Sequence, residues 1–255
     1  MRDLHFLFDC TSDELDILVS IMVKKGQVIG KTPLEKEKNY KKYYPKHEKY
    51  VSEIIRSYLD FGGNEFKMLF GGLPTYMDVL RLTAEKIDVE TTENETIDAI
   101  ETKILEKLLQ PFLKDLTPEA EEELLQALGG RANFPNGISE EAIFQGLRLG
   151  GAVGGNIALL ILNGVGSSVA GKALYYAAGG MAVAQVGHVA AAGIGGRALA
   201  LLTGPVGAAI MGVWAIYDIY NLAGPAYRVI VPATTCIAAL RRVQKARSRG
   251  ELDIF

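Results

Sequence analysis

Hydrophobic side chains recur every three or four positions through the first half of the chain, and this spacing predicts amphipathic helices. In residues 11–23, TSDELDILVSIMV, the side chains of Leu15, Leu18, Val19 and Met22 fall on one helical face. Similar segments begin near positions 50, 74, 92, 117 and 139. No segment shows the alternation of hydrophobic and polar positions that is typical of a strand. The sequence therefore predicts an all-α fold.

Some of these helices carry recognisable start and stop signals. Thr11 and Glu14 have the spacing of a capping box, in which each residue satisfies an amide of the other. Thr92 and Glu95 repeat this spacing and are predicted to cap the longest helix of this half. Gly62 follows a hydrophobic stripe and is predicted to end the second helix.

Beyond residue 148 the periodic pattern gives way to three runs without charge, at residues 149–171, 173–196 and 198–217. A helix needs about 20 apolar residues to cross the hydrocarbon core of a bilayer, and each run is long enough. The middle run is rich in alanine and glycine and contains Gln185 and His188, so it would insert only weakly by itself.

Small residues recur at every fourth position in this second half, and 17 of the 28 glycines lie in residues 149–227. Residues four apart share a helix face, so a row of them lets a neighbouring backbone approach closely. Such contact drives helix association in a bilayer. The predicted helix-packing residues are Gly146, Gly150, Gly154, Gly179, Gly187, Gly195, Gly204, Ala208 and Gly212.

Aromatic and basic side chains flank the last uncharged run, as they do where a helix leaves a membrane. Residues 241–249 contain five cations, which suits an anionic cytoplasmic surface, although a solvated helix end is an alternative. The predicted membrane-interface residues are Trp214, Tyr217, Tyr220, Arg241, Arg242 and Lys245.

Charge divides the chain in the same way. Residues 1–148 carry 19 basic and 27 acidic side chains, whereas residues 149–227 carry three charged side chains in all. The predicted organisation has three parts: an amphipathic helical domain at 1–145, an apolar Gly/Ala-rich helical hairpin or three-helix unit at 146–240, and a basic tail at 241–255.

A lysine-rich stretch, residues 24–49, lies between the first two predicted helices and holds nine lysines against three glutamates, with tyrosines between them. One interpretation is a solvated connector. A second is contact with anionic lipid or nucleic acid, of which lipid is favoured because no RNA-binding motif accompanies the lysines. A third is docking against the acidic residues 85–123.

The sequence contains little that indicates a catalytic site. GSSVAGKA, residues 166–173, resembles a phosphate-binding loop, but Ala173 stands where a serine or threonine must hold Mg²⁺. An ATPase is therefore a minor alternative. The three histidines lack metal-ligand spacing, and the two cysteines favour a reducing compartment. We expect no enzymatic activity, cofactor, metal or small-molecule substrate.

Three stretches carry a family resemblance: RDLHFLFDCTSDELDILV at residues 2–19, residues 61–90, and GPVGAAIMGVWAIYDIYNLAGPAYRVIVPATTCIAALRR at residues 204–242. They resemble the YaaW family of uncharacterised bacterial proteins. The family's distant grouping with chaperones that assemble ubiquinol–cytochrome c reductase implies a helical, non-enzymatic assembly or interaction role by analogy. The resemblance supplies no catalytic residues.

These patterns together predict a membrane-associated binding or assembly protein in the bacterial cytoplasm, at the inner membrane. The expected partner is a membrane or a membrane protein, with self-association as a further option and no nucleic acid. Two alternatives stay open. The apolar segment could insert only after a trigger and form a pore, or the chain could be a wholly soluble binding module with a buried Gly/Ala core.

Overall fold

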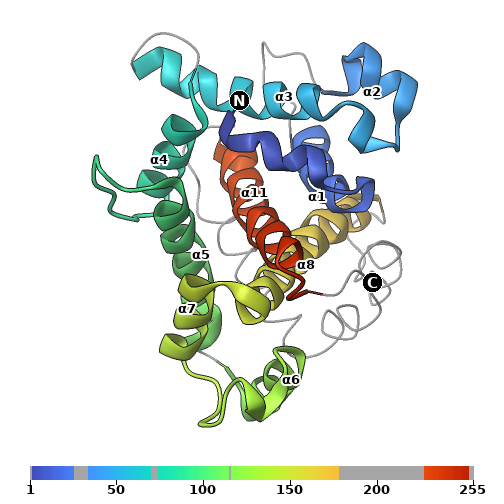
Figure 1. The fold of residues 1–255 in the computed structure, drawn as a ribbon. Coiled ribbons are helices and arrows are strands. Elements are labelled where there is room, and N and C mark those ends of the chain that lie inside the picture. Colours follow the sequence, from blue (N-terminus) through green and yellow to red (C-terminus); the bar gives the residue numbers. More distant parts are fainter. Residues whose placement is uncertain (1, 26–33, 70–73, 115, 178–226, 253–255) are drawn as a thin grey trace. The chain divides into compact units, whose positions relative to one another are not determined.

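The computed structural model describes residues 2–25, 34–69, 74–114, 116–177 and 227–252, and every regular element in them is helical (Figure 1). This confirms the predicted all-α fold. The short 3-10 helices are η1 (Arg2–Asp9), η2 (Leu34–Lys36), η3 (His47–Lys49) and η4 (Gly130–Ala132). The α-helices are α1 (Ser12–Lys25), α2 (Lys38–Tyr43), α3 (Val51–Leu69), α4 (Tyr76–Lys86), α5 (Ile97–Lys114), α6 (Pro118–Ala127), α7 (Glu140–Leu149), α8 (Gly151–Ala177) and α11 (Tyr227–Ser248).

The chain forms two compact units, each made of two segments. Unit 1 comprises Met1–Ile104 and Tyr220–Ala238, and unit 2 comprises Leu105–Ile219 and Ala239–Phe255. These limits differ from the predicted boundaries after residues 145 and 240. The sequence boundaries follow composition, whereas compactness follows packing, and α11 contributes its first half to unit 1 and its second half to unit 2.

The start of α1 is the predicted capping box. The backbone N–H of Thr11 donates to Glu14 Oε2 at 2.8 Å, and the N–H of Glu14 donates to Thr11 Oγ1 at 3.3 Å. Two amides that the first helical turn leaves without partners are thereby satisfied. The cap fixes where the hydrophobic stripe begins, and Leu15 and Leu18 are completely buried.

The second predicted helix does not end at Gly62. Helix α3 continues through Gly62 and Gly63 to Leu69. A β-carbon at Gly62 would collide with the side chain of Val79 on α4, so this glycine lets α3 and α4 approach each other. The glycine therefore has a packing role and does not mark the end of the helix.

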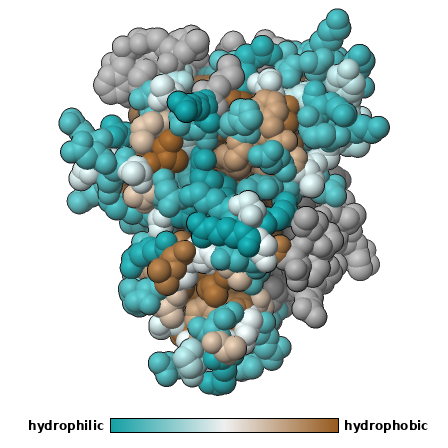
Figure 2. All heavy atoms as spheres, in the orientation of Figure 1, coloured by the Kyte–Doolittle hydropathy of each residue, from teal (hydrophilic) through white to brown (hydrophobic). Residues whose placement is uncertain are grey.

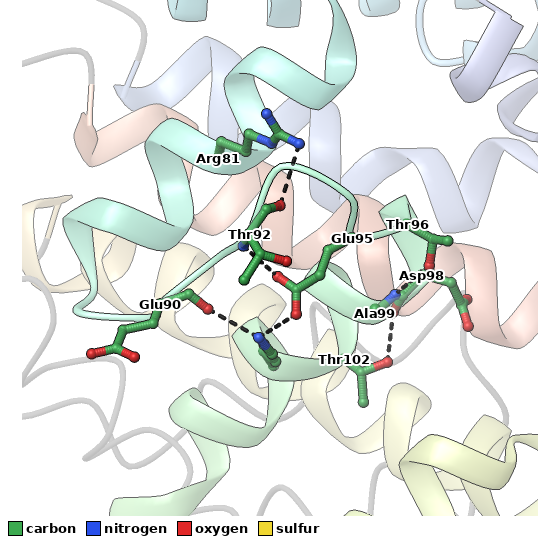
Figure 3. A network of polar contacts seen from close by, with 9 residues as sticks. Arg81, Glu90, Thr92, Glu95, Thr96, Asp98, Ala99 and Thr102 are labelled. Carbon is green, nitrogen blue, oxygen red and sulfur yellow. Dashed lines mark hydrogen bonds and ion pairs between the residues drawn. The ribbon is translucent and has the colours of Figure 1, made fainter.

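The predicted cap of α5 is also wrong by one turn. The helix begins at Ile97, and Thr96 Oγ1 accepts the N–H of Ala99 at 3.2 Å. Thr92 and Glu95 do pair, because the N–H of Thr92 donates to Glu95 Oε2 at 3.0 Å, but they do so in the preceding loop. Figure 3 shows this loop folded against α5 by polar contacts.

Two cations hold that loop in place. Lys103 on α5 donates to the carbonyl of Glu90 at 3.0 Å and forms an ion pair with Glu95 (Figure 3). Arg81 on α4 donates to the carbonyl of Glu93 at 2.7 Å. The hydrogen bond from Lys103 lowers the pKa of the Glu95 carboxyl below its ordinary value. The contacts join α4 and α5 around a loop that has no regular structure.

Helix α11 supplies polar as well as apolar groups to the core of unit 1. Its residues 229–240 are all buried. Within them, Thr234 Oγ1 lies 2.7 Å from the hydroxyl of Tyr58 on α3 and 3.0 Å from Thr83 Oγ1 on α4. A second pair lies nearby in the same unit, where the Tyr76 hydroxyl donates to the buried Glu101 carboxylate at 2.6 Å. Buried polar groups of this kind must be paired, so these bonds specify how α3, α4, α5 and α11 align.

The two cysteines are both enclosed in unit 1, since Cys10 is 3% exposed and Cys236 is 0% exposed. Burial, with a smaller contribution from Cys10, raises the pKa of the Cys236 thiol. We expect the native thiols to react with an aromatic disulfide reagent on the order of a hundredfold more slowly than in urea, because both are buried in the native protein and urea exposes them. Rapid stoichiometric labelling of both thiols in the native protein would contradict this packing.

On the face drawn in Figure 2, most of the described surface is hydrophilic and is broken by smaller apolar patches. The exposed large hydrophobic side chains among the described residues are Phe8 at 46%, Tyr44 at 56% and Leu149 at 81%. The last of these stands at the end of α7, where the candidate site begins.

Candidate functional site

The apolar half of the chain opens with a sharp corner between α7 and α8 (Figure 1). Gly150 and Gly151 have φ values of +73° and +68°, a region that side chains on other residues disfavour. The two helices that meet there are bent by 110°. Leu149, the last residue of α7, is 81% exposed at this corner.

Two of the predicted packing glycines bring the arms of the corner together. A β-carbon on Gly154 would lie 2.8 Å from the carbonyl oxygen of Gly146, closer than real β-carbons approach backbone. A β-carbon on Gly146 would lie 2.8 Å from Val153 Cγ1 and 3.1 Å from Ile157 Cδ1. The first turn of α8 therefore packs directly on the backbone of α7, which only glycine permits.

The arrangement differs from the predicted one in a specific way. Gly146, Gly150 and Gly154 do not form a row on one helix, because the helix stops at Leu149 and restarts at Gly151. Gly150 makes the turn, and a β-carbon there would meet nothing within 4 Å. A spacing of four is typical of a row along one helix. Here Gly150 forms a turn, and the glycines four residues before and after it, Gly146 and Gly154, contact each other across that turn.

Helix α8 is mostly buried from Gly154 onward, as far as its side chains are described. From Gly154 to Val165 every side chain is buried except those of Asn156 and Leu159, which are partly exposed. Gly155 packs against the second half of α11, where its β-carbon would lie 2.9 Å from Ala246 Cβ. A helix that is apolar all round is normally either a core helix or a membrane helix.

The segment that resembles a phosphate-binding loop is helical. Residues 166–173 lie inside α8, which passes through Lys172 without interruption. In an α-helix each N–H beyond the first turn donates to the carbonyl four residues earlier, so the amides of this segment are already used. A phosphate-binding loop needs those amides free, and this geometry is therefore inconsistent with one.

The remaining predicted positions divide into two groups. The described basic residues lie near the end of α11: Lys245 is exposed, Arg241 is partly exposed, and Arg242 is only 5% exposed and lies inside the protein. The positions that lie outside the described residues are Gly179, Gly187, Gly195, Gly204, Ala208, Gly212, Trp214, Tyr217 and Tyr220.

Among the described residues, no single helix combines the length and the apolar character needed to cross a membrane. One pair of helices, Glu140–Leu149 with Gly151–Val165, meets both requirements when the two are taken together, but it is bent by 110°. The corner is therefore the candidate for insertion into a membrane within the part of the chain that the structure describes.

Sequence reasoning missed a second polar cluster, which lies in unit 1. His47 is 1% exposed, and its Nε2 lies 2.9 Å from Asp16 Oδ1 on α1. Its Nδ1 is bonded to the hydroxyl of Tyr50, which precedes α3. The ring of Tyr44 lies edge-on to His47 at a centroid distance of 5.7 Å. We call Asp16, His47 and Tyr50 the histidine cluster.

The histidine cluster is suited to structure rather than to nucleophilic chemistry. Burial is the main cause that raises the pKa of Tyr50, so its phenol stays protonated and is a poor nucleophile. Asp16 lies 31 residues before His47 in the sequence, so no local motif indicates their contact. The local sequence offered one signal, the tyrosines close to His47, because an aromatic cluster is built from such residues.

Within the described residues these features define an all-helical protein with a glycine-packed apolar helix corner. Comparison with known proteins adds its family. A UPF0174 protein of Helicobacter pylori strain J99 is 29% identical over 245 residues, which cover 94% of this chain and 90% of that protein. Another, from Helicobacter pylori strain 26695, is 34% identical over 214 residues, which cover 82% of this chain and 95% of that protein. The UPF0174 protein YaaW of Escherichia coli K12 is 26% identical over 255 residues, which cover 96% of this chain and 95% of that protein.

The chain belongs to the UPF0174 family, which confirms the resemblance to YaaW inferred from the sequence. The similarity extends over most of the chain and includes both the helical first half and the apolar second half. No family model matches the chain, and no solved structure matches it.

Proposed function

We propose that this protein is a non-enzymatic, membrane-associated binding or assembly protein that acts at the cytoplasmic face of the bacterial inner membrane. The observation that carries the proposal is the α7–α8 corner. It combines enough apolar length for membrane contact with a 110° bend, and Leu149 is 81% exposed at the bend. A hydrophobic side chain that is so exposed at a helix corner is suited to insertion into a bilayer or to a partner, and the charge of the adjacent Arg148 is paired with Glu106 and Glu141.

The packing of the corner suits a lipid environment. Burial from water no longer drives helices together inside a bilayer, so close van der Waals contact must do so. The contact of Gly154 with the Gly146 carbonyl is of this kind, because it brings backbone against backbone. Helix α8 carries one charged residue, Lys172, in 27 positions, which lowers the desolvation penalty of insertion.

Cell fractionation followed by a carbonate wash tests the proposal. We expect the wild-type chain in the washed membrane pellet, and we expect Leu149→Asp to move a substantial part of it to the supernatant. A charge near the centre of an apolar segment opposes insertion by about 3 kcal/mol. Phe8→Asp is the matched control, because it removes another exposed hydrophobic side chain and should leave the distribution unchanged. Full recovery of the wild-type chain in the soluble fraction would sink the proposal.

A second candidate is a wholly soluble binding module whose Gly/Ala-rich helices form its core. The burial of α8 from Gly154 to Val165 favours it, because protein atoms alone can cover that helix. Size-exclusion chromatography without detergent separates the two candidates. A sharp, monodisperse peak supports the soluble module, whereas aggregation that detergent reverses supports membrane association.

A further inference from the structure

Helix α2 and its flanks present two different faces. Tyr40 and Tyr44 lie four residues apart and so share one face of the chain. Their rings lie 5.2 Å apart, and the ring of Tyr40 lies 5.6 Å from that of Tyr50. Tyr44 also contacts the ring of His47. The tyrosine face of α2 is thus anchored on the histidine cluster.

The opposite face consists of lysines. Lys38, Lys41 and Lys42 have the i, i+3, i+4 spacing of one helical face, and all three are exposed. The residues just before and after α2 add three more exposed lysines, Lys36, Lys46 and Lys49. We call these six residues the lysine face. Residues 34–49 contain no arginine and only three acidic residues, so the surface is strongly positive.

Apart from the exposed Glu35, the carboxylates around the lysine face are engaged by other groups. Glu37 pairs with Arg56 at 3.3 Å, Glu48 accepts from Ser12, and Glu53 accepts from Asn39. Asp16 is held by His47. None of the six lysines forms an ion pair with a carboxylate in the part of the chain that the structure describes. The positive charge of this surface is therefore available to a partner.

We propose that the lysine face binds an anionic phospholipid surface. Lysines near such a surface each strengthen binding about fivefold through a delocalised attraction that needs no fixed geometry. Tyr44 lies between Lys42 and Lys46 in the sequence and stays 56% exposed although its ring contacts His47, so it provides an amphipathic ring for the headgroup region. Nucleic-acid interfaces rely heavily on arginine for bidentate contacts, and residues 34–49 contain none, so lipid is the better match.

This contact goes beyond the proposed function, because it is electrostatic and peripheral and does not require insertion of the α7–α8 corner. The two also respond differently to their surroundings. Attraction between exposed charges weakens as salt shortens the screening length, whereas apolar insertion does not weaken in this way. Salt sensitivity therefore separates the lysine face from the corner.

Vesicle sedimentation with the purified full chain tests the inference. The vesicles contain phosphatidylcholine alone or phosphatidylcholine with phosphatidylglycerol, at low and at high salt. We expect binding to the anionic vesicles at low salt, and we expect the variant Lys38→Gln/Lys41→Gln/Lys42→Gln to bind at least about tenfold more weakly. The changed side chains are exposed, so the melting temperature should stay the same, and circular dichroism checks this.

The matched control, Lys107→Gln/Lys114→Gln/Arg131→Gln, removes the same charge from residues outside residues 34–49 and should bind the anionic vesicles almost as well as wild type. Equal loss in both variants would overturn the inference, because net charge alone would then explain the binding. No binding of the wild-type chain to anionic vesicles would also overturn it.

Tighter binding to single-stranded RNA that only the first variant loses would replace lipid by nucleic acid. If the carbonate wash releases the protein but anionic vesicles still bind it, the proposed insertion fails and the lysine face stands.

Discussion

Replacing Gly154 by valine is expected to lower the free energy of unfolding by about 3 kcal/mol, at the upper end of overpacking substitutions. The new β-carbon would lie 2.8 Å from the carbonyl oxygen of Gly146, and that atom belongs to backbone, which cannot rotate out of the way. The gain in helix propensity over glycine is at most about 1 kcal/mol and does not offset the clash. Urea denaturation followed by circular dichroism measures the change.

The matched control is Asn156→Ala on the same helix. Asn156 is partly exposed, so this change should alter the free energy of unfolding by less than about 0.5 kcal/mol. If Gly154→Val is as stable as the control, the backbone contact between α7 and α8 does not exist in the folded protein. The same result would remove the packing argument from the proposed function.

Replacing His47 by alanine is expected to lower the free energy of unfolding by about 3 kcal/mol. The change leaves the hydroxyl of Tyr50 without its partner, and an unsatisfied buried polar group costs about 1–3 kcal/mol. It also removes a ring that lies against Tyr44 and Tyr50, and the resulting cavity adds to the loss. Thermal unfolding monitored by tyrosine circular dichroism reports both effects.

Asp16→Asn provides the comparison for this cluster. The Asp16 side chain is 55% exposed, and asparagine keeps an oxygen that can accept a hydrogen bond from the ring of His47. We expect a loss below about 1 kcal/mol, because the hydrogen bond to the imidazole is kept. A loss as large as that of His47→Ala would mean that the carboxylate of Asp16, and not the burial of the imidazole, holds α1 against η3.

Much of the helical pattern was predictable because the signals for it are local. The stripe of Leu15 and Leu18 and the capping box at Thr11 lie within one or two turns of each other, so the sequence contains all the information that α1 needs. The cap of α5 was not predictable in this way. Thr92 and Thr96 both have plausible capping roles, and the contacts of Lys103 and Arg81 with the loop decide between them.

The candidate site was predictable in its residues but not in its geometry. Gly146 and Gly154 were identified from their spacing, yet that spacing is the same whether the helix continues or turns between them. The backbone conformation at Gly150 decides whether the helix continues or turns. Its φ of +73° and ψ of −137° lie in a region that is favourable for glycine alone. The histidine cluster was beyond prediction, because the contact of His47 with Asp16 depends on how η3 folds back on α1.

The two-part construction of unit 1 has a consequence for synthesis of the protein. Its first segment ends at Ile104, but the helix that carries Thr234 is translated more than a hundred residues later. At the usual pace of translation, about 5–20 residues per second, the nascent chain waits on the order of ten seconds for that helix. During this interval α3 and α4 have no α11 to pack against, so we expect the unfinished polypeptide to expose apolar surface that favours aggregation.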